Sequence, residues 1–506
     1  MGNRYGMFKY GAEKYGASNA QTLLWSLEID WDHDELFDGS NEAQYLSDLS
    51  TTRGREYITK PDGSGYESVT IGRADLVLNN GTRRFDPWYV YSPLYGKICT
   101  GRKVRIRVKY PGISTPADVF AGFISDIQPI SGIDKKVRIS LVDGVQYLQD
   151  NNASVLIHQN VSFADGIDAV LDAVEWPAIW GRDLETGIAE IPYWWADSET
   201  GKDAIASLVD ANLGVFFIAS DGKAKFYSRN HISQSILILD EDKLDSEVLI
   251  PQPWEVVRNN IQVMVHSMTS QALGDLWSLG EAPLIGPGES LTIFANFSFS
   301  GTECPAINVL APVAVTDYLG NSVQNGNGTN LTGAISIATT VFSKTAKLVA
   351  TNNGLTPLYL TLLKIRGNAI VETSTLTMEA KDPASQADFG KRLFSLDSPW
   401  IQNINNAMAF VNTIKAMMAF PRAFPQVRIE ARPEIQFKPD LFDAATLDLP
   451  NAGISDDFRL GRIEHKWLDS NGQSVRTDWK FETFENINEN VWVFPTRVGV
   501  SSIFGY

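Results

Sequence analysis

Hydrophobic and polar positions alternate along the first third of the chain, as they do in half-buried strands. Arg73–Leu78 and Arg102–Lys109 each place every second side chain on one face, and turn residues such as Asn79-Asn80-Gly81 lie at their ends. Phe120–Ile124 and Val137–Leu141 continue the pattern. Short strands separated by Gly and Pro, without a helical period, predict an antiparallel barrel or sandwich over residues 23–152.

The period changes to a helical one between residues 153 and 236. Ser162 lies three residues before Asp165, a spacing typical of a helix N-cap, and Trp176-Pro177 ends the helix. A second helix precedes Gly214, and Asp221-Gly222 marks a hairpin turn, since both residues tolerate a positive φ. The apolar helical positions are Ile167, Val170, Leu171, Val174, Ile205, Leu208 and Val209. We therefore expect a small α+β domain.

Residues 269–365 are rich in Ser, Thr, Asn and Gly and poor in charge. Many short strands with frequent turns predict an immunoglobulin-like β-sandwich here. It would interrupt a second β-barrel domain that begins in 237–268 and continues in 366–384. Residues 385–424 carry a helical period, with a helix predicted over Asn403–Ala419 whose apolar face is Ala407, Phe410, Val411, Ile414 and Met418. Residues 425–506 return to strands, so the second barrel would end there with a C-terminal tail.

The fold predicted from these patterns is mainly β, with two β-barrels, small α+β domains and the inserted sandwich. The last hairpin, Phe458–Phe484, has the layout of the Phe120–Leu141 pair, which suggests a duplicated barrel split by insertions. Residues 1–22 precede the first barrel as an N-terminal arm. They carry Tyr-Gly at a spacing of five, at Tyr5, Tyr10 and Tyr15. Such a segment suits an arm that lies on a neighbouring subunit, or a loose terminus.

Length and composition narrow the function classes. With 506 residues the chain is long enough for several domains, and a net charge of −17 argues against a surface that grips phosphates. The charge suits a wall that repels nucleic acid, or plain solubility. The two cysteines, Cys99 and Cys304, imply no disulfide framework and fit folding in a reducing cytoplasm. We find neither a secretion signal nor an apolar run long enough to span a membrane.

Candidate metal ligands occur at Asp30, Asp32 and Asp34, which place carboxylates at alternate positions as calcium loops do. Glu35 stands where such a loop needs Gly, and the twelfth position holds no Glu. An acidic hairpin loop is therefore the preferred interpretation, and we predict no metal and no cofactor. The five histidines show no ligand spacing.

Enzyme motifs do not support a catalytic function. Neither a nucleophile elbow nor a phosphate loop occurs, although carboxylate pairs for glycoside cleavage need no local motif. Trp194-Trp195-Ala196-Asp197, with Trp176 and Trp180, could line a sugar groove, but dense aromatics are more often core or interface. We predict no catalytic residues.

Basic side chains share one face of the Arg102–Lys109 strand. They are Lys103, Arg105, Arg107 and Lys109. Facing a lumen they would contact DNA, but in an acidic chain a solvated or inter-subunit face is the preferred interpretation. With Tyr5, Tyr10 and Tyr15 they are our candidates for inter-subunit contact.

Four stretches, in this order, resemble the bacteriophage tail-hub (tail-tip or baseplate-hub) proteins. They are the Tyr-Gly leader, the segment Arg73–Lys109, the strand Phe120–Ile127 leading to Val142-Asp143-Gly144, and the strand Arg459–His465 before a hairpin. The resemblance covers about half of the chain.

The resemblance implies that both β-barrels are tail-tube-like and that the chain is a structural protein of the virion, made in the host cytoplasm. Copies would form a homotrimer whose six barrels make a pseudo-sixfold ring that continues the tail tube. The implied partners are the distal tail protein, the tape-measure protein and a tail fibre or central spike protein. DNA would pass through the lumen without specific binding. The alternatives are a distal tail protein in a hexameric ring, a virion-associated carbohydrate-active enzyme, and an adhesion protein that binds through residues 269–365.

Overall fold

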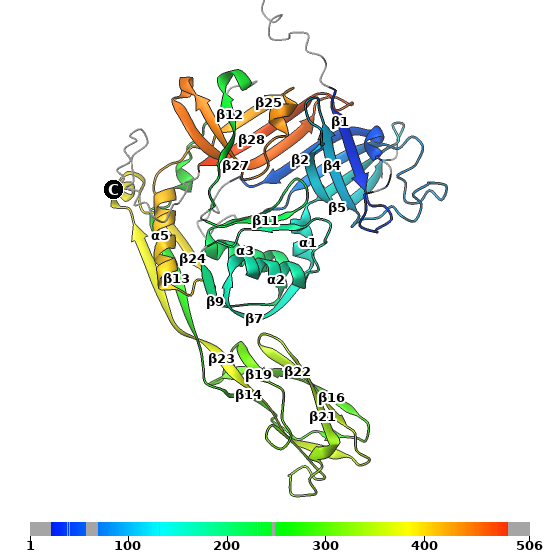
Figure 1. Ribbon diagram of the computed structural model, residues 1–506, viewed down its shortest axis with the longest axis vertical. Helices are drawn as coiled ribbons and strands as arrows, with labels where there is room; N and C mark the ends of the chain where they lie inside the picture. Colours follow the sequence, from blue (N-terminus) through cyan, green and yellow to red (C-terminus); the bar gives the residue numbers. More distant parts are fainter. Residues whose placement is uncertain are drawn as a thin grey trace, which may run out of the picture.

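The computed structural model describes residues 22–483, apart from 38, 40, 57–68, 131, 188, 230 and 245–247. A body built on a large sheet lies at one end, a helical module lies beside it, and an arm projects to the far end (Figure 1). Strands make up most of the regular structure, which confirms the predicted mainly-β class.

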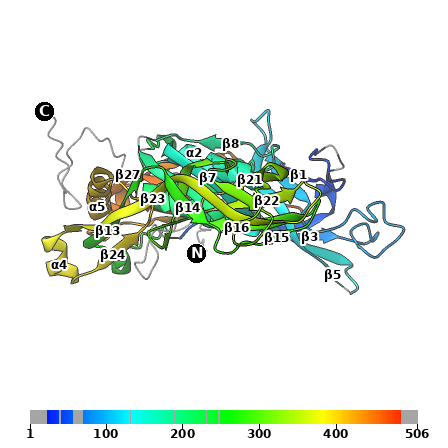
Figure 2. The same ribbon diagram turned by 90° about the horizontal axis from the view of Figure 1, so that it is seen from below.

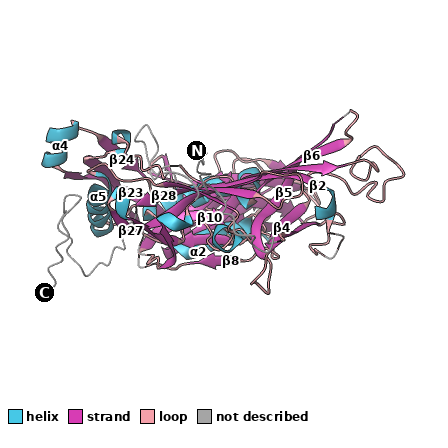
Figure 3. Cartoon of the chain, turned by 90° about the horizontal axis from the view of Figure 1, so that it is seen from above, coloured by secondary structure: helices cyan, strands magenta, loops and turns pink. Residues whose placement is uncertain are grey.

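The first half of the large sheet contains six antiparallel strands in the order β1-β4-β5-β6-β3-β2. Alternating residues are buried, as predicted; on β3 they are Ala74, Leu76 and Leu78. Figure 3 shows the β5/β6 end of the sheet projecting to one side. The strands are β1 Leu24–Ile29, β2 Leu46–Gly54, β3 Arg73–Asn79, β4 Lys103–Lys109, β5 Ala117–Ile130 and β6 Lys136–Val142.

The second half of the sheet is organised around the long strand β27. The first part of β27 pairs with β26, its last part pairs with β2, and β28 runs along its other side. β25 extends the sheet beyond β28, and β12 pairs in parallel with β26. The strands are β12 Ser235–Asp240, β25 Gln426–Glu430, β26 Ala444–Leu449, β27 Ile454–Trp467 and β28 Val475–Thr483.

The two separate barrels predicted from the sequence are not what the pairing shows. Among the described strands, hydrogen bonds run through both halves as one 11-stranded sheet, and pairing closes neither half into a ring. The reason is the pairing of β2 with the last part of β27, which joins the halves directly. Each half still has its own core, one centred on residues such as Leu27 and Phe120, the other on residues such as Leu447 and Phe481.

Two glycines lie where the sheet forks, at the point along β27 where its pairing partner changes from β26 to β2. The register of β27 against β28 shifts between Leu460 and Arg462, and the Gly461 carbonyl accepts a hydrogen bond from the Arg55 amide at 2.8 Å. Gly54 lies opposite with φ of +94°, and a Cβ there would come within 2.1 Å of the Gly461 oxygen. Only glycine fits this approach without moving backbone.

The helical module follows β6 and packs below the sheet (Figure 1). Ser162 caps α2 by accepting a hydrogen bond from the Asp165 amide, as the sequence predicts, and the hairpin around Asp221 and Gly222 also forms. The elements are α1 Gly144–Asp150, β7 Asn152–Ser162, α2 Phe163–Ala173, β8 Arg182–Leu184, β9 Glu190–Thr200, α3 Gly201–Asn212, β10 Val215–Ile218 and β11 Ala224–Tyr227.

A two-stranded ribbon of β13 and β23 leads from the body to the arm, and β24 pairs in parallel with β13 at the body end. Helix α5 packs on this ribbon through its predicted apolar face, which includes Phe410, Val411 and Ile414. The elements are β13 Asn260–Ser270, β23 Leu358–Lys381, α4 Pro383–Phe389, β24 Leu393–Asp397, α5 Ile404–Met418 and α6 Pro433–Gln436.

The arm consists of the strands that lie between β13 and β23 in the sequence, together with the outer part of β23. It lies at the bottom of Figure 1 and nearest the viewer in Figure 2. Four strands pair with the outer part of β23, and a three-stranded sheet, β16-β22-β21, adds a second layer over a shared core. The strands are β14 Gly274–Ser278, β15 Leu284–Ile285, β16 Ser290–Asn296, β17 Ser298–Phe299, β18 Thr302–Glu303, β19 Ala306–Leu310, β20 Tyr318–Asn321, β21 Ile335–Val341 and β22 Thr345–Asn352.

The fork predicts a large effect of Gly54→Ala on stability. The new Cβ would meet the Gly461 carbonyl oxygen and would hold an alanine at a positive φ, so we expect a loss of about 3 kcal/mol. The measurement is the urea midpoint of the purified chain.

Gly96→Ala is the matched control. Gly96 also has a positive φ, of +79°, but no atom lies within 4 Å of a Cβ built there. This variant keeps the conformational cost of about 1 kcal/mol and lacks the clash. Equal losses in the two variants would show that the close approach does not constrain the sheet.

Candidate functional site

One partly buried carboxylate, that of Asp440, joins the two halves of the sheet and the helical module. Arg53, at the end of β2, forms an ion pair with Asp440 at 2.7 Å between Nη1 and Oδ1. The second oxygen of Asp440 accepts hydrogen bonds from the amide and hydroxyl of Ser220, in the β10–β11 turn, at 2.7 and 3.0 Å. Asp440 precedes β26, so it links both halves of the sheet to the helical module.

A second buried ion pair lies beside the first. Arg55 donates to both oxygens of Glu482 on β28, at 2.8 and 3.1 Å, and both side chains are almost fully buried. The guanidinium also lies over the Phe442 ring, 5.1 Å from its centroid. A bidentate pair of this kind fixes orientation as well as distance, so the end of β2 is held in register with the second half of the sheet.

His465, on β27, is buried beside these charges. Its Nδ1 lies 2.9 Å from the Thr477 hydroxyl, and its ring packs against Phe437. Burial, with the nearby Arg53 charge, lowers the pKa of His465 to about 3. Burial by itself would raise the pKa of Asp440, but the Arg53 charge and amide hydrogen bonds outweigh it and lower that pKa. The junction therefore holds a neutral imidazole beside an ionised Arg–Asp pair.

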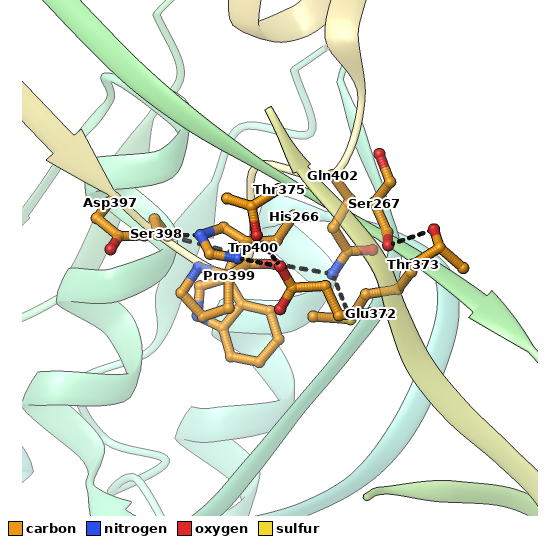
Figure 4. Close-up of polar contacts among 11 residues, drawn as sticks. His266, Ser267, Glu372, Thr373, Thr375, Asp397, Ser398, Pro399, Trp400 and Gln402 are labelled. Atoms are coloured by element: carbon orange, nitrogen blue, oxygen red, sulfur yellow. Dashed lines mark hydrogen bonds and ion pairs between the residues drawn. The ribbon is translucent and has the colours of Figure 1, made fainter. Parts of the chain in front are cut away.

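The root of the arm carries a second polar cluster, shown in Figure 4. His266 on β13 lies between two carboxylates: Nδ1 is 3.0 Å from Glu372 Oε1 on β23, and Nε2 is 2.6 Å from Asp397 Oδ1 at the end of β24. The imidazole is 15% exposed, whereas the carboxylates are 40% and 60% exposed. Three strands thus meet at one side chain where the ribbon leaves the body.

Gln402 completes the attachment of the ribbon. Its side chain accepts from the Tyr193 amide at 3.0 Å, donates to the Tyr193 carbonyl at 2.7 Å and contacts the Met268 sulfur at 3.4 Å. The His266 amide donates to the Ile401 carbonyl at 2.8 Å. The loop after β24 therefore ties the helical module to β13.

An exposed aromatic loop connects β3 to β4. Trp88 and Tyr91 are 76% and 82% exposed. The loop is nevertheless held from beneath, because Phe85 is fully buried and the Ser92 hydroxyl donates to the Arg84 carbonyl at 2.5 Å. Large rings on a fixed loop are suited to contact with another protein.

Most basic side chains of the predicted basic face of β4 form ion pairs within the chain. The Lys103 ammonium lies 2.6 Å from Glu35, and Arg105 and Arg107 both pair with Glu28 on β1, at 2.7 and 2.5 Å. Lys109 is exposed at the end of the strand. Two carboxylates thus pair with three of the four cations, and the role of these cations in inter-subunit contact remains a prediction. Tyr5, Tyr10 and Tyr15 lie outside the described residues.

The acidic loop uses its carboxylates for its own hydrogen bonds. Asp30 is buried and accepts from the amides of Asp34 and Glu35, each at 3.1 Å. Asp34 accepts from the Leu36 amide at 3.0 Å, and Asp32 pairs with Lys97. Among the described residues no group of three or more His, Cys, Asp or Glu side chains is arranged to hold a metal ion.

The tryptophans considered for a sugar groove belong to the core of the helical module. Trp176, Trp180 and Trp194 are buried in one cluster with α2 and α3. Trp195 is partly buried, and its ring lies edge-on to Trp400 at 5.0 Å. The structure confirms the core interpretation for the three buried rings.

Sequence reasoning missed the junction and the arm root, because their partners are distant in sequence. Arg53 and Asp440 lie far apart in the sequence although their side chains are in contact, and no local spacing links His266 to Glu372 or Asp397. The aromatic loop did have a signal, since Trp88 to Tyr95 form a run of aromatic and apolar residues between two strands.

The chain has the fold of tail proteins. It superposes on a tail protein from Neisseria meningitidis MC58 with a TM-score of 0.50 and 10% identity, covering 91% of this chain and 96% of the other. A 43 kDa tail protein of prophage MuSo2 from Shewanella oneidensis is similar with a TM-score of 0.47 and 10% identity, over 90% and 98% of the two chains. A prophage tail protein from Listeria monocytogenes EGD-e gives 0.38 and 8%, over 86% and 94%.

Comparisons at the level of sequence add no relatives. The chain matches no protein-family model, and it matches no curated protein. Within the described residues, helices of the length and apolarity needed to cross a membrane are absent. The superposition on the Neisseria meningitidis protein confirms, at the level of the fold, the tail-protein resemblance predicted from the sequence.

The buried imidazole predicts how His465→Gln should respond to pH. Folding holds His465 neutral down to about pH 3, so the parent loses stability as pH falls below about 6.5, where the unfolded chain takes up the proton first. Glutamine has no such titration. The loss of stability caused by the substitution should therefore shrink by about 2 kcal/mol between pH 7 and pH 5.

Urea unfolding of parent and variant at both pH values measures this difference. Titration of other groups, such as Asp143, whose pKa burial raises to about 7, affects both proteins and cancels. A loss of stability that is the same at both pH values would contradict the assignment of His465 as a buried neutral group.

Proposed function

We propose that this chain, which has the fold of a tail protein, is a structural component of a bacteriophage tail tip. It would form the hub ring that continues the tail tube and connects it to fibres or a spike. The observation that carries the proposal is one sheet with two halves, each with its own core, on that fold. The halves take the place of the two predicted barrels, so three chains would supply six tube segments.

The expected partners follow from this position. The ring would lie between a distal tail protein and the fibre or spike, and the tape-measure protein and then DNA would pass through its lumen. The net charge of −17 supports a passage without binding, because an acidic wall repels the phosphate backbone.

The arm would decorate the outside of the ring as an immunoglobulin-like sandwich. Two sheets over one core, carried on a long ribbon away from the body, support this placement. Phe294 and Leu355 on the arm are 63% and 95% exposed, which suits contact with another tail component or a host surface.

A hexameric ring, as expected for a distal tail protein, is the alternative with support in the fold. It would use one tube segment per chain, whereas both halves of the sheet here have complete cores. A carbohydrate-active enzyme has less support, because three of the four tryptophans that would line its groove, Trp176, Trp180 and Trp194, are buried.

The stoichiometry of the assembled ring tests the proposal. We expect the purified full-length chain to form trimers, because each chain already carries two tube segments. Native mass spectrometry at increasing protein concentration measures this. Hexamers would support the distal tail protein instead, and a monomer at all concentrations would contradict a ring-forming role.

Variants of the aromatic loop test whether neighbouring subunits bury this surface of the chain. The double variant Trp88→Ala with Tyr91→Ala should weaken assembly by tenfold or more, since losing two large anchor side chains costs about 2 kcal/mol or more in a contact. Its urea midpoint should match the parent, because both rings are exposed.

The matched control is Phe294→Ala with Leu355→Ala, which removes exposed apolar side chains from the arm. Assembly should be unchanged in this variant. Equal weakening in both double variants would show a general loss of surface hydrophobicity rather than a specific contact of the loop.

A further inference from the structure

The ribbon that carries the arm is attached to the body over a short stretch of β13. Beyond Ser267 the register of β13 against β23 shifts, which leaves Thr373 out of the ladder, and from there the ribbon runs on into the arm. β24 pairs with β13 only from Asn260 to Met264. His266 and Met268, which contacts Gln402, are therefore anchored on the part of β13 beyond the β24 pairing, and Figure 4 shows His266 between Glu372 and Asp397.

The contacts of His266 connect the arm to the body through both ring nitrogens. Glu372 lies on the arm side, on β23, and Thr375 donates to the same Glu372 oxygen at 2.5 Å, which orients the carboxylate. Asp397 lies on the body side, at the end of β24. Losing either contact would remove the side-chain link on that side, while the backbone pairing of β13 with β23 would remain.

The number of N–H groups on the His266 imidazole decides whether both contacts can be hydrogen bonds. A neutral imidazole carries one N–H, so it can donate to only one of two carboxylates, and the other contact would join two lone pairs. An imidazolium donates from both nitrogens, and each bond is then charge-assisted. At 3.0 and 2.6 Å both ring nitrogens lie within hydrogen-bond distance of a carboxylate oxygen, and only the doubly protonated ring can donate to both.

We propose that His266 is a protonation-dependent lock that fixes the direction of the arm relative to the body. The charged groups that face the ring are Glu372 from β23 and Asp397 from β24. The adjoining loop presents Ser398, Trp400 and Gln402, none of which carries a charge. With the proton in place both carboxylates are held. Without it one of them is released and the arm root loosens.

Distance measurements between the body and the arm tip test the lock. Cys99 is an exposed thiol in the body, Cys304 is buried, and Leu355 is exposed at the turn between β22 and β23. Spin labels on Cys99 and on Leu355→Cys report the distance between the two parts by pulsed electron paramagnetic resonance. The distribution should be narrow at about pH 5 and broader at about pH 8, the range over which histidines change charge.

Two variants make the test specific. An amide can either accept from or donate to a ring nitrogen, so Asp397→Asn lets a neutral imidazole keep both contacts. Its distribution should stay narrow at both pH values. His266→Ala removes both contacts, so its distribution should be broad at both. Lys381→Ala, which removes an exposed ion pair with Glu379 on the same strand, should behave like the parent.

The outcomes separate the lock from other effects of pH. A parent distribution that is the same at both pH values would overturn the proposal. So would an Asp397→Asn variant that broadens as the parent does, because another group would then be titrating. The lock does not depend on the tail-tip function, since the measurement uses the chain alone and does not require a ring.

Discussion

The pairing of β27 with both halves of the large sheet is the constraint on which the rest of the structure depends. A single strand bonds to β26 along its first part, to β2 along its last part and to β28 along its other side. The fork requires the backbones of Gly54 and Gly461 to approach closely, and the partly buried pair Arg53–Asp440 and the buried pair Arg55–Glu482 hold it in register. Each buried charge is matched, as burial of ions demands. The two cores are consequently fixed relative to each other instead of hinged.

The arm is attached to the body in a different way from that in which the two half-sheets are joined. It is joined to the body by one ribbon, and the root of the ribbon combines apolar packing against α5 with the polar contacts of His266 and Gln402. Polar contacts with partly exposed partners contribute little stability compared with a core, but they are sensitive to conditions. The body thus suits a rigid ring segment, and the arm suits an appendage whose direction can change.

Local patterns were enough to predict the strands of the first half-sheet other than β2, the cap at Ser162 and the helix ending near Ala419, because each depends on neighbours in sequence. The merging of the two halves could not be predicted, since it depends on Ser50–Gly54 meeting Arg462–Lys466 across the whole chain. The parallel pairs of β12 with β26 and β13 with β24 were missed for the same reason. Of the candidate site residues, Asp30 and Arg105 were noticed for their charge, but only coordinates show that their partners lie within the chain.

The central claim is that one continuous sheet supplies two successive segments of a tube wall. An electron cryomicroscopy map of the assembled ring tests it most directly. The account predicts threefold symmetry, with the two half-sheets of each chain alternating around the lumen and joined through β27. A sixfold ring in which only one half-sheet of each chain lines the lumen would contradict it.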